Sequence, residues 1–260
     1  MIDALGRIAV GIGDDAAVLD GGLVAAADML VEGTHFDRRR LDARRIGERA
    51  AAANLSDMAA MGADPLCLLA SLGLPDGFDE VAALAEGLAS HGVPLVGGDL
   101  VRAPSLVVSV AVLGRCARPV LRSGGRPGDR LVVTGELGGQ AASGFTRAVV
   151  PRLAEGRALA EVATAMIDIS DGIVADARRL ADASACLAAV ELARLPVAEG
   201  ATLEQAAAGG EDYELLAALP PETASPVPVV EVGRLAEGEG AVLLDPAGSP
   251  VNLQGWRHFG

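Results

Sequence analysis

The stretch DARRIGERAAAANLSDMAAMG, residues 42–62, predicts one long helix that carries an acidic side chain within an apolar segment. It begins with an aspartate, continues in helix-forming residues and ends with a glycine, which are the signals of a helix start and stop. Asp57 lies in its second half, although aspartate is a poor helix former. Asn54 lies one turn earlier on the same face. An acid in this place indicates a role other than folding.

Apolar and helical segments alternate on both sides of this helix. A segment rich in glycine and proline, residues 118–135, marks a crossing between two units. The pattern is typical of an α/β (α+β mixed) fold, with sub-domains at residues 1–117 and 118–260. We expect further helices over 78–92, 138–150 and 172–184, and strands over 23–31, 65–75, 93–99, 105–116, 129–135, 165–170, 214–219, 227–235 and 241–245.

The composition excludes several classes of protein. The chain has 260 residues and a net charge of −14, which argues against nucleic acid or an anionic membrane as a partner. All 21 basic residues are arginines, and a P-loop needs a lysine. Three scattered cysteines and three histidines show no zinc-site spacing. With an acidic N-terminus and no apolar run of about 18 residues, we expect a soluble, cytoplasmic protein.

Aspartates recur at the ends of apolar strands or beside glycine turns. Singly, each is accounted for by ordinary turn chemistry, but strand-end acids of an α/β fold converge on one crevice. Two unit charges about 4 Å apart repel by about 4 kcal/mol at an effective dielectric near 20, so such a group needs cations. Oxygen ligands alone suit Mg²⁺, which would carry phosphates to the glycine turns. The aspartates are Asp14, Asp15, Asp28, Asp99, Asp168 and Asp171, together with the helical Asp57.

Six segments resemble, in this order, the thiamine-monophosphate kinases, relatives of aminoimidazole ribonucleotide synthetase. They are GIGDDAAVL (11–19), DMLVEGTHF (28–36), NLSDMAAMGADP (54–65), VGGD (96–99), IDISDG (167–172) and GGEDYELL (209–216). The resemblance implies a two-domain fold whose N-terminal halves pair across a dimer axis into a β-barrel with flanking helices. It also implies a homodimer in which the γ-phosphoryl group of ATP passes directly to thiamine monophosphate, with several Mg²⁺ ions and no catalytic base.

The same resemblance assigns roles to individual residues. It places Asp15, Asp28, Asp57, Asp99, Asp168 and Asp171 on Mg²⁺; Gly98, Asp99, Arg122 and Ser170 on ATP; and His35, Glu211 and Trp256 on thiamine monophosphate. A purely structural role stays open for each residue of the thiamine set: His35 as a structural histidine, Glu211 as a solvated turn acid, and Trp256 as an apolar anchor for the C-terminal tail.

Two alanines keep alternative functions open. Ala26 and Ala27 stand where the family has hydroxyl residues before an aspartate, so a metal there must use a backbone carbonyl or water. The alternatives are another ATP-using member of the superfamily, of the synthetase or hydrogenase-maturation type, and an inactive nucleotide-binding paralogue. The apolar segment 105–114 alternates poorly, and we expect it to be buried on both faces at the dimer interface.

Overall fold

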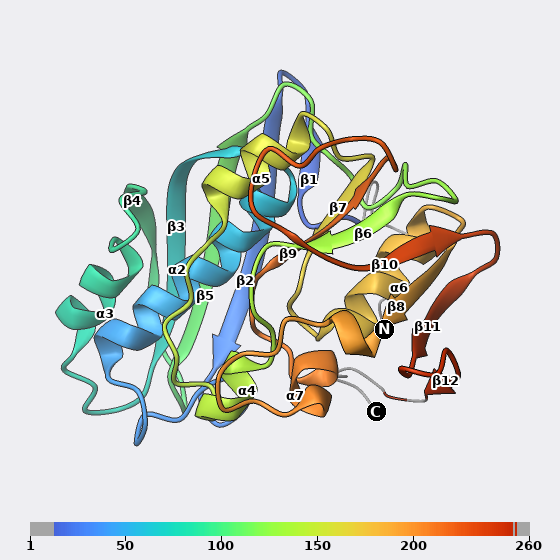
Figure 1. The fold of residues 1–260 in the computed structure, drawn as a ribbon. Coiled ribbons are helices and arrows are strands. Elements are labelled where there is room, and N and C mark those ends of the chain that lie inside the picture. Colours follow the sequence, from blue (N-terminus) through green and yellow to red (C-terminus); the bar gives the residue numbers. More distant parts are fainter. Residues whose placement is uncertain (1–12, 252, 254–260) are drawn as a thin grey trace.

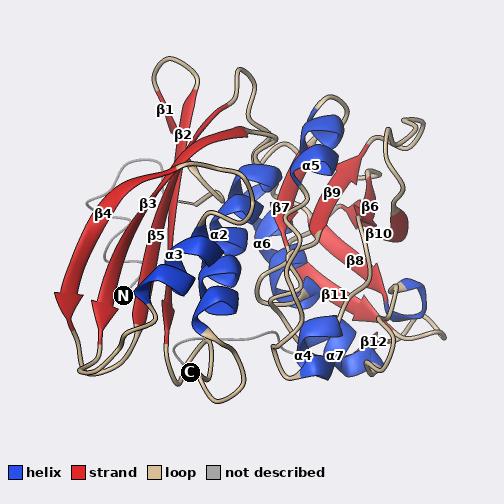
Figure 2. Ribbon diagram, turned by 90° about the vertical axis from the view of Figure 1, so that its left-hand side faces the viewer, coloured by secondary structure: helices blue, strands red, loops and turns tan. Residues whose placement is uncertain are grey.

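Two β-sheets with helices between them form the scaffold (Figures 1 and 2). The computed structural model describes residues 13–251 and residue 253. The first sheet ends at Arg115 and the second begins at Arg130. The predicted mixed α/β architecture is therefore confirmed, with one sheet from each half of the sequence. No helix among the described residues has the length and apolar character needed to cross a membrane.

The first sheet has five strands in the order β1-β2-β5-β3-β4. Only β3 and β4 run parallel; the other neighbours are antiparallel. Helices α2 (Ala43–Ala60) and α3 (Val81–Leu88) cover one of its faces (Figure 2). The strands are β1 (Ala17–Leu19), β2 (Leu23–Val31), β3 (Asp64–Leu74), β4 (Leu95–Arg102) and β5 (Val107–Arg115).

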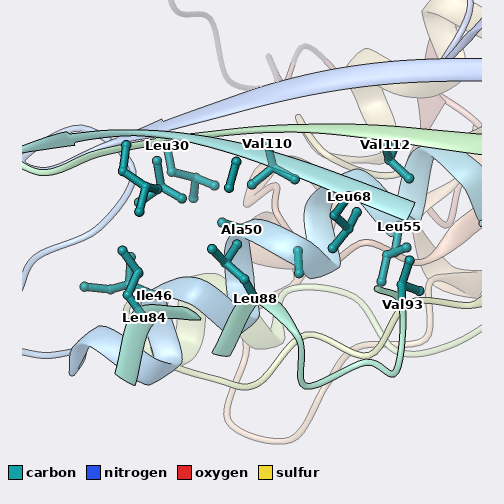
Figure 3. Packing of buried hydrophobic residues seen from close by; sticks show 14 of the residues in the cluster. Leu30, Ile46, Ala50, Leu55, Leu68, Leu84, Leu88, Val93, Val110 and Val112 are labelled. Atoms are coloured by element: carbon teal, nitrogen blue, oxygen red, sulfur yellow. The ribbon is translucent and has the colours of Figure 1, made fainter. Parts of the chain in front are cut away.

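Helix α2 forms where the sequence predicts it, because Asp42 caps its first turn by accepting a hydrogen bond from the Arg45 backbone N–H over 2.8 Å. Its apolar face packs on the first sheet (Figure 3). Helix α3 lies so close that a Cβ at Gly47 would be 2.2 Å from the Leu84 carbonyl oxygen. Helix α2 also contacts β7 of the second sheet, so it lies between the two halves and can present side chains to both.

The second sheet has seven strands in the order β12-β11-β8-β10-β6-β9-β7. They are β6 (Arg130–Val133), β7 (Ala165–Asp168), β8 (Leu187–Glu191), β9 (Leu215–Leu219), β10 (Val230–Ala236), β11 (Gly240–Leu244) and β12 (Pro250–Val251). Its helices are α4 (Gly139–Ser143), α5 (Leu153–Ala160), α6 (Ile173–Ala183), the 3₁₀ helix η1 (Leu192–Arg194) and α7 (Leu203–Ala208). Strands β1, β8 and β12 and helices α5, η1 and α7 were not anticipated from the sequence.

One expectation about the elements is wrong. The helix expected over 138–150 is only the five-residue α4, because Gly144 and Phe145 have φ of 61° and 63°, outside the right-handed helical region. Within a single chain, strand β5 is buried on one face, and the burial of its other face at a dimer interface stays a prediction. Its buried residues alternate strictly with half-buried ones, since α2 and α3 cover one face only.

The face of the first sheet turned away from α2, here called the outer face, carries exposed apolar side chains. By strand register and alternation it includes Leu19, Met29, Leu69 and Val101, and these are 39–55% exposed. Among the described residues the sheet is open and forms no closed barrel, with β1 and β4 as its edges. Several large apolar side chains exposed on one face of a sheet are a candidate interaction surface.

Candidate functional site

A cleft of about 440 Å³ lies where α2, the end of β2, the loop before β1 and four loops of the second half meet. Nine of the residues that the resemblance assigned to a role line this cleft. They are Asp15, Asp28, His35, Asp57, Arg122, Asp168, Ser170, Asp171 and Glu211. Segments distant in the sequence therefore converge on one site, and its two ends have different chemistry.

At one end of the cleft three carboxyl groups, here called the acidic trio, lie close together. One oxygen each of Asp15, Asp57 and Asp168 lies within 4.8 Å of the others. Asp168 ends β7 and accepts a hydrogen bond from the buried Ser56 hydroxyl over 2.6 Å. Helix α2 thus supplies Asp57 to the trio and orients Asp168 through the hydrogen bond from Ser56. A donor set of carboxylate oxygens alone fits Mg²⁺.

Electrostatics support a cation at the trio. Burial raises the pKa of Asp57 and Asp168 well above the usual range, and the neighbouring carboxylates raise it further. Burial also raises the pKa of Asp15, although Arg122 opposes the rise. Asp28 lines the cleft, and desolvation raises its pKa as well, although His35 opposes the rise. Without a cation, these groups would hold protons or repel one another.

Arg122 closes the trio on one side. Its Nη2 donates to Asp15 Oδ1 over 2.7 Å, and its backbone N–H donates to Asp14 Oδ1 over 2.7 Å. The residue expected to contact ATP is therefore paired here with a residue expected to bind metal. The guanidinium group of Arg122 therefore places a positive charge beside the carboxylates of the trio.

Side chains of α6 bind the loop that follows β7 through hydrogen bonds and ion pairs. The buried Asp176 accepts hydrogen bonds from the backbone N–H groups of Ser170 and Asp171, over 3.1 and 3.0 Å. Arg179 forms ion pairs with both Asp176 and Asp171. The two loop residues expected to bind ATP and metal are thus fixed by a pair, Asp176 and Arg179, that no sequence motif had indicated.

The opposite end of the cleft contains His35 and Glu211. The Val31 backbone N–H donates to His35 Nδ1 over 3.0 Å, so a neutral ring carries its proton on Nε2. Glu211, at φ 56°, forms an ion pair with the buried Arg49 of α2. A second cavity of about 470 Å³ shares Thr34, His35 and Phe145 with the cleft, which it extends. This end has room for an extended ligand.

Gly98 and Asp99 do not line the cleft, for two reasons visible in the sheet. Strand β4 is separated from β2 by β5 and β3, about 14 Å at ordinary strand spacing. The register places Gly98 in one row with Asp28, so Asp99, one residue on, faces the outer side. The close β3–β4 approach itself accounts for Gly98, because a Cβ there would lie 1.7 Å from the Ala70 carbonyl oxygen.

Trp256, expected on thiamine monophosphate, lies outside the described residues. Arg49, which no motif pointed to, lies two helical turns before Asp57 on the same face of α2. The i, i+4, i+8 spacing of Arg49, Ala53 and Asp57 could have indicated that Arg49 lies on the same side of α2 as the cleft.

Comparison with known proteins gives a consistent result. The family model for the AIR synthase related protein N-terminal domain matches residues 13–116. The thiamine-monophosphate kinase of Halobacterium salinarum is 38% identical, with 99% of this chain and 98% of the relative covered. That of Escherichia coli K12 is 34% identical, with 97% and 92% covered.

Solved structures agree with the sequence relatives. AaThiL complexed with AMPPCP and TMP superposes with a TM-score of 0.92 at 30% identity, covering 99% of this chain and 96% of that one. The hydrogenase maturation protein HypE in complex with ATP has a TM-score of 0.75 at 18% identity, covering 92% and 87%. The second likeness shows a shared fold alone.

Proposed function

The chain belongs to the thiamine-monophosphate kinase family, and we propose that its cleft transfers the γ-phosphoryl group of ATP to the phosphate of thiamine monophosphate, giving thiamine diphosphate. The observation that carries the proposal is one cleft with the acidic trio at one end and His35 and Glu211 at the other. The first end suits metal-bound polyphosphate, and the second suits an organic acceptor.

Mg²⁺ would be held by the acidic trio, with Asp28 and Asp171 beside it. When bound, it neutralises charge on the transferring phosphate groups. Arg122 and Ser170 would contact ATP from the two sides of this end. Local positive charge, rather than the net charge of −14, then decides how two polyanions bind.

His35, Glu211 and Trp256 would bind thiamine monophosphate. The Val31 backbone N–H donates to His35 Nδ1, and this hydrogen bond holds the imidazole ring at the cleft, where it would face the acceptor phosphate. The adjoining cavity beyond Phe145 gives the thiamine rings a place to lie. Trp256 is the only tryptophan, so quenching of its emission by thiamine monophosphate, but not by ATP alone, would support its assignment.

Positioning accounts for the catalysis that this chain must supply. The acceptor is a phosphate that is largely deprotonated near pH 7, so it needs no strong base to become a nucleophile. The cleft has to hold donor and acceptor oxygens in line with the γ-phosphorus and exclude water. The loop fixed by Asp176 and Arg179 keeps Ser170 and Asp171 in place for this task.

We propose further that the enzyme is a cytoplasmic homodimer with domains at residues 1–117 and 118–260. The exposed outer face would pack on the same face of a second copy, and the two open sheets would together close a barrel. Asp99 lies on that outer face. It would therefore reach the metal end of a cleft only across the dimer axis, together with Gly98.

The direct test is incubation with Mg²⁺, ATP and thiamine monophosphate, followed by chromatography for ADP and thiamine diphosphate. We expect equal amounts of the two products, none with unphosphorylated thiamine, and none from the Asp57→Asn variant. ADP without thiamine diphosphate would favour another reaction of the superfamily. Absence of both products, with ATP still bound, would favour an inactive nucleotide-binding paralogue.

A further inference from the structure

The buried guanidinium of Arg49 links helix α2 to helix α4 and to two loops of the second half of the chain. Its Nη1 donates to Gln140 Oε1 and to the Phe145 carbonyl oxygen, each over 3.1 Å. Its Nη2 pairs with Glu211 Oε2. One side chain of the first half thus fixes both loops that border the acceptor end of the cleft.

Arg49 is present at a cost in stability. Its side chain is 4% exposed, and its Nε is buried without a hydrogen-bond partner among the described residues. A buried donor left without a hydrogen-bond partner destabilises the folded state. Arginine at a helix position that apolar residues could fill therefore points to a role at the cleft.

Glu211 has one oxygen committed and one available. Arg49 holds Oε2, whereas Oε1 makes no hydrogen bond within residues 13–251. The side chain is 23% exposed and lines the cleft. The Glu211 backbone N–H donates to the Ser170 carbonyl oxygen over 2.7 Å, so neither the backbone nor the carboxylate can turn freely.

A carboxylate fixed in this way favours ligand groups that donate hydrogen bonds. It accepts hydrogen bonds and cannot donate them, so a phosphate oxygen is a poor partner and an amino group is a good one. Thiamine monophosphate carries a phosphate at one end and an aminopyrimidine at the other. The pair with Arg49 also removes most of the net charge that would repel the phosphate.

We propose that Arg49 is a positioning residue that orients Glu211, and that the free Glu211 oxygen accepts a hydrogen bond from the pyrimidine amino group of the acceptor. The pair would decide which acceptor is phosphorylated and would leave ATP binding untouched. This inference rests on the proposed function, because it assigns a part of the same acceptor site.

The test compares thiamine monophosphate with its analogue in which a keto group replaces the pyrimidine amino group. A hydrogen bond to a charged group contributes about 1.5–3 kcal/mol, so wild type should favour the amino substrate by roughly 10- to 100-fold in kcat/KM. Glu211→Gln, Arg49→Met and Arg49→Lys are measured beside it. Calorimetric binding of each compound without ATP gives a second readout.

We expect Arg49→Met to raise KM for thiamine monophosphate about 5-fold or more, to reduce the preference for the amino substrate, and to leave KM for ATP unchanged. Arg49→Lys should restore part of the preference, and Glu211→Gln should reduce it as Arg49→Met does. The matched control is Arg45→Met, because Arg45 lies one turn earlier and donates to the Thr146 carbonyl oxygen without contacting Glu211. It should keep the wild-type preference.

The outcomes separate this inference from the proposed function. If wild type makes no thiamine diphosphate, the proposed function fails. If wild type does so but shows no preference between the two acceptors, the inference alone fails. It also fails if Arg45→Met changes the preference as much as Arg49→Met, since the effect would then come from the loop. Should Arg49→Met not fold, Arg49→Lys and Glu211→Gln decide the question.

Discussion

Arg122 Nη2 lies 2.7 Å from Asp15 Oδ1, so an arginine expected to bind nucleotide pairs with an acid expected to bind metal. Asp15 belongs to the acidic trio. A cation bound at the trio competes with Arg122 for this carboxylate, and the displaced guanidinium can then turn to a phosphate. The pair therefore links metal binding to nucleotide binding.

Arg122→Met should affect these two events in opposite directions. Mg²⁺ binding without nucleotide, followed by calorimetry, should become tighter because a competing cation is gone. KM for ATP should rise roughly 10- to 100-fold, which corresponds to one lost charge-assisted hydrogen bond. Arg126→Met, on an exposed residue of the same segment, is the control and should change neither. Weaker Mg²⁺ binding in Arg122→Met would contradict the competition.

Asp57→Asn should stabilise the protein when metal is removed by a chelator. The pKa of Asp57 is raised in the folded state, so folding favours the protonated acid. Its contribution to the free energy of unfolding is complete below the ordinary pKa near 3.8 and is lost as pH rises through the raised value. Asparagine has no such loss. The variant should melt at least about 2–4 °C above wild type at pH 8 and nearer to it at pH 5.

The same variant should lose most of kcat and lose its advantage in stability when Mg²⁺ is added, because only wild type retains the full metal site. Thermal melts at the two pH values, each with chelator and with Mg²⁺, check both statements. A metal-free wild type that becomes more stable from pH 5 to pH 8 would show that the trio does not hold raised pKa values.

The sequence predicted those features that depend on local signals. Helix α2 follows from its Asp42 cap and its glycine stop, and β2 matches the expected range 23–31. The convergence of strand-end acids follows from the general behaviour of α/β folds, and it brought Asp15 and Asp168 together. The first two inferences needed only residues near one another in the chain, and the third needed only a general rule about the fold.

Features that depend on strand order or on distant partners could not be predicted. Nothing local to VGGD indicates that β4 is an edge strand or that Asp99 faces outward. The local sequence does not distinguish Arg49 from a solvent-exposed helical arginine, because its partners Gln140 and Glu211 are 91 and 162 residues away. The early end of α4 is different, because its left-handed C-cap Gly144 is a local stop signal that the expected range 138–150 passed over.

Activity should require Mg²⁺ beyond the amount bound as Mg-ATP. The acidic trio with Asp28 and Asp171 beside it offers more carboxylates than one ion uses. With ATP held constant and saturating, the rate should continue to rise after one equivalent of Mg²⁺. Ionic strength is kept constant with a monovalent salt as the control. Saturation at one equivalent would show that a multi-metal site is absent.

Asp99→Asn and Asp57→Asn should each be nearly inactive alone, yet they should restore activity together if the homodimer forms as proposed. Asp99 lies on the outer face of the edge strand β4, whereas Asp57 lines the cleft of its own chain. In a mixed dimer, the chain with Asp99→Asn keeps Asp57 and receives an intact Asp99 from its partner. One of the two sites is then complete.

The two variants are mixed, partly unfolded and refolded so that the chains exchange, and then assayed. Random pairing gives half of the dimers one working site, so about 25% of the wild-type rate should return. Refolding each variant by itself is the control and should restore nothing. If mixed dimers form, shown by light scattering and a mass tag on one chain, but stay inactive, Asp99 acts within its own chain or not at all. An active monomer by light scattering would remove the dimer from the proposal altogether, because a single chain holds Asp99 about 14 Å or more from Asp28.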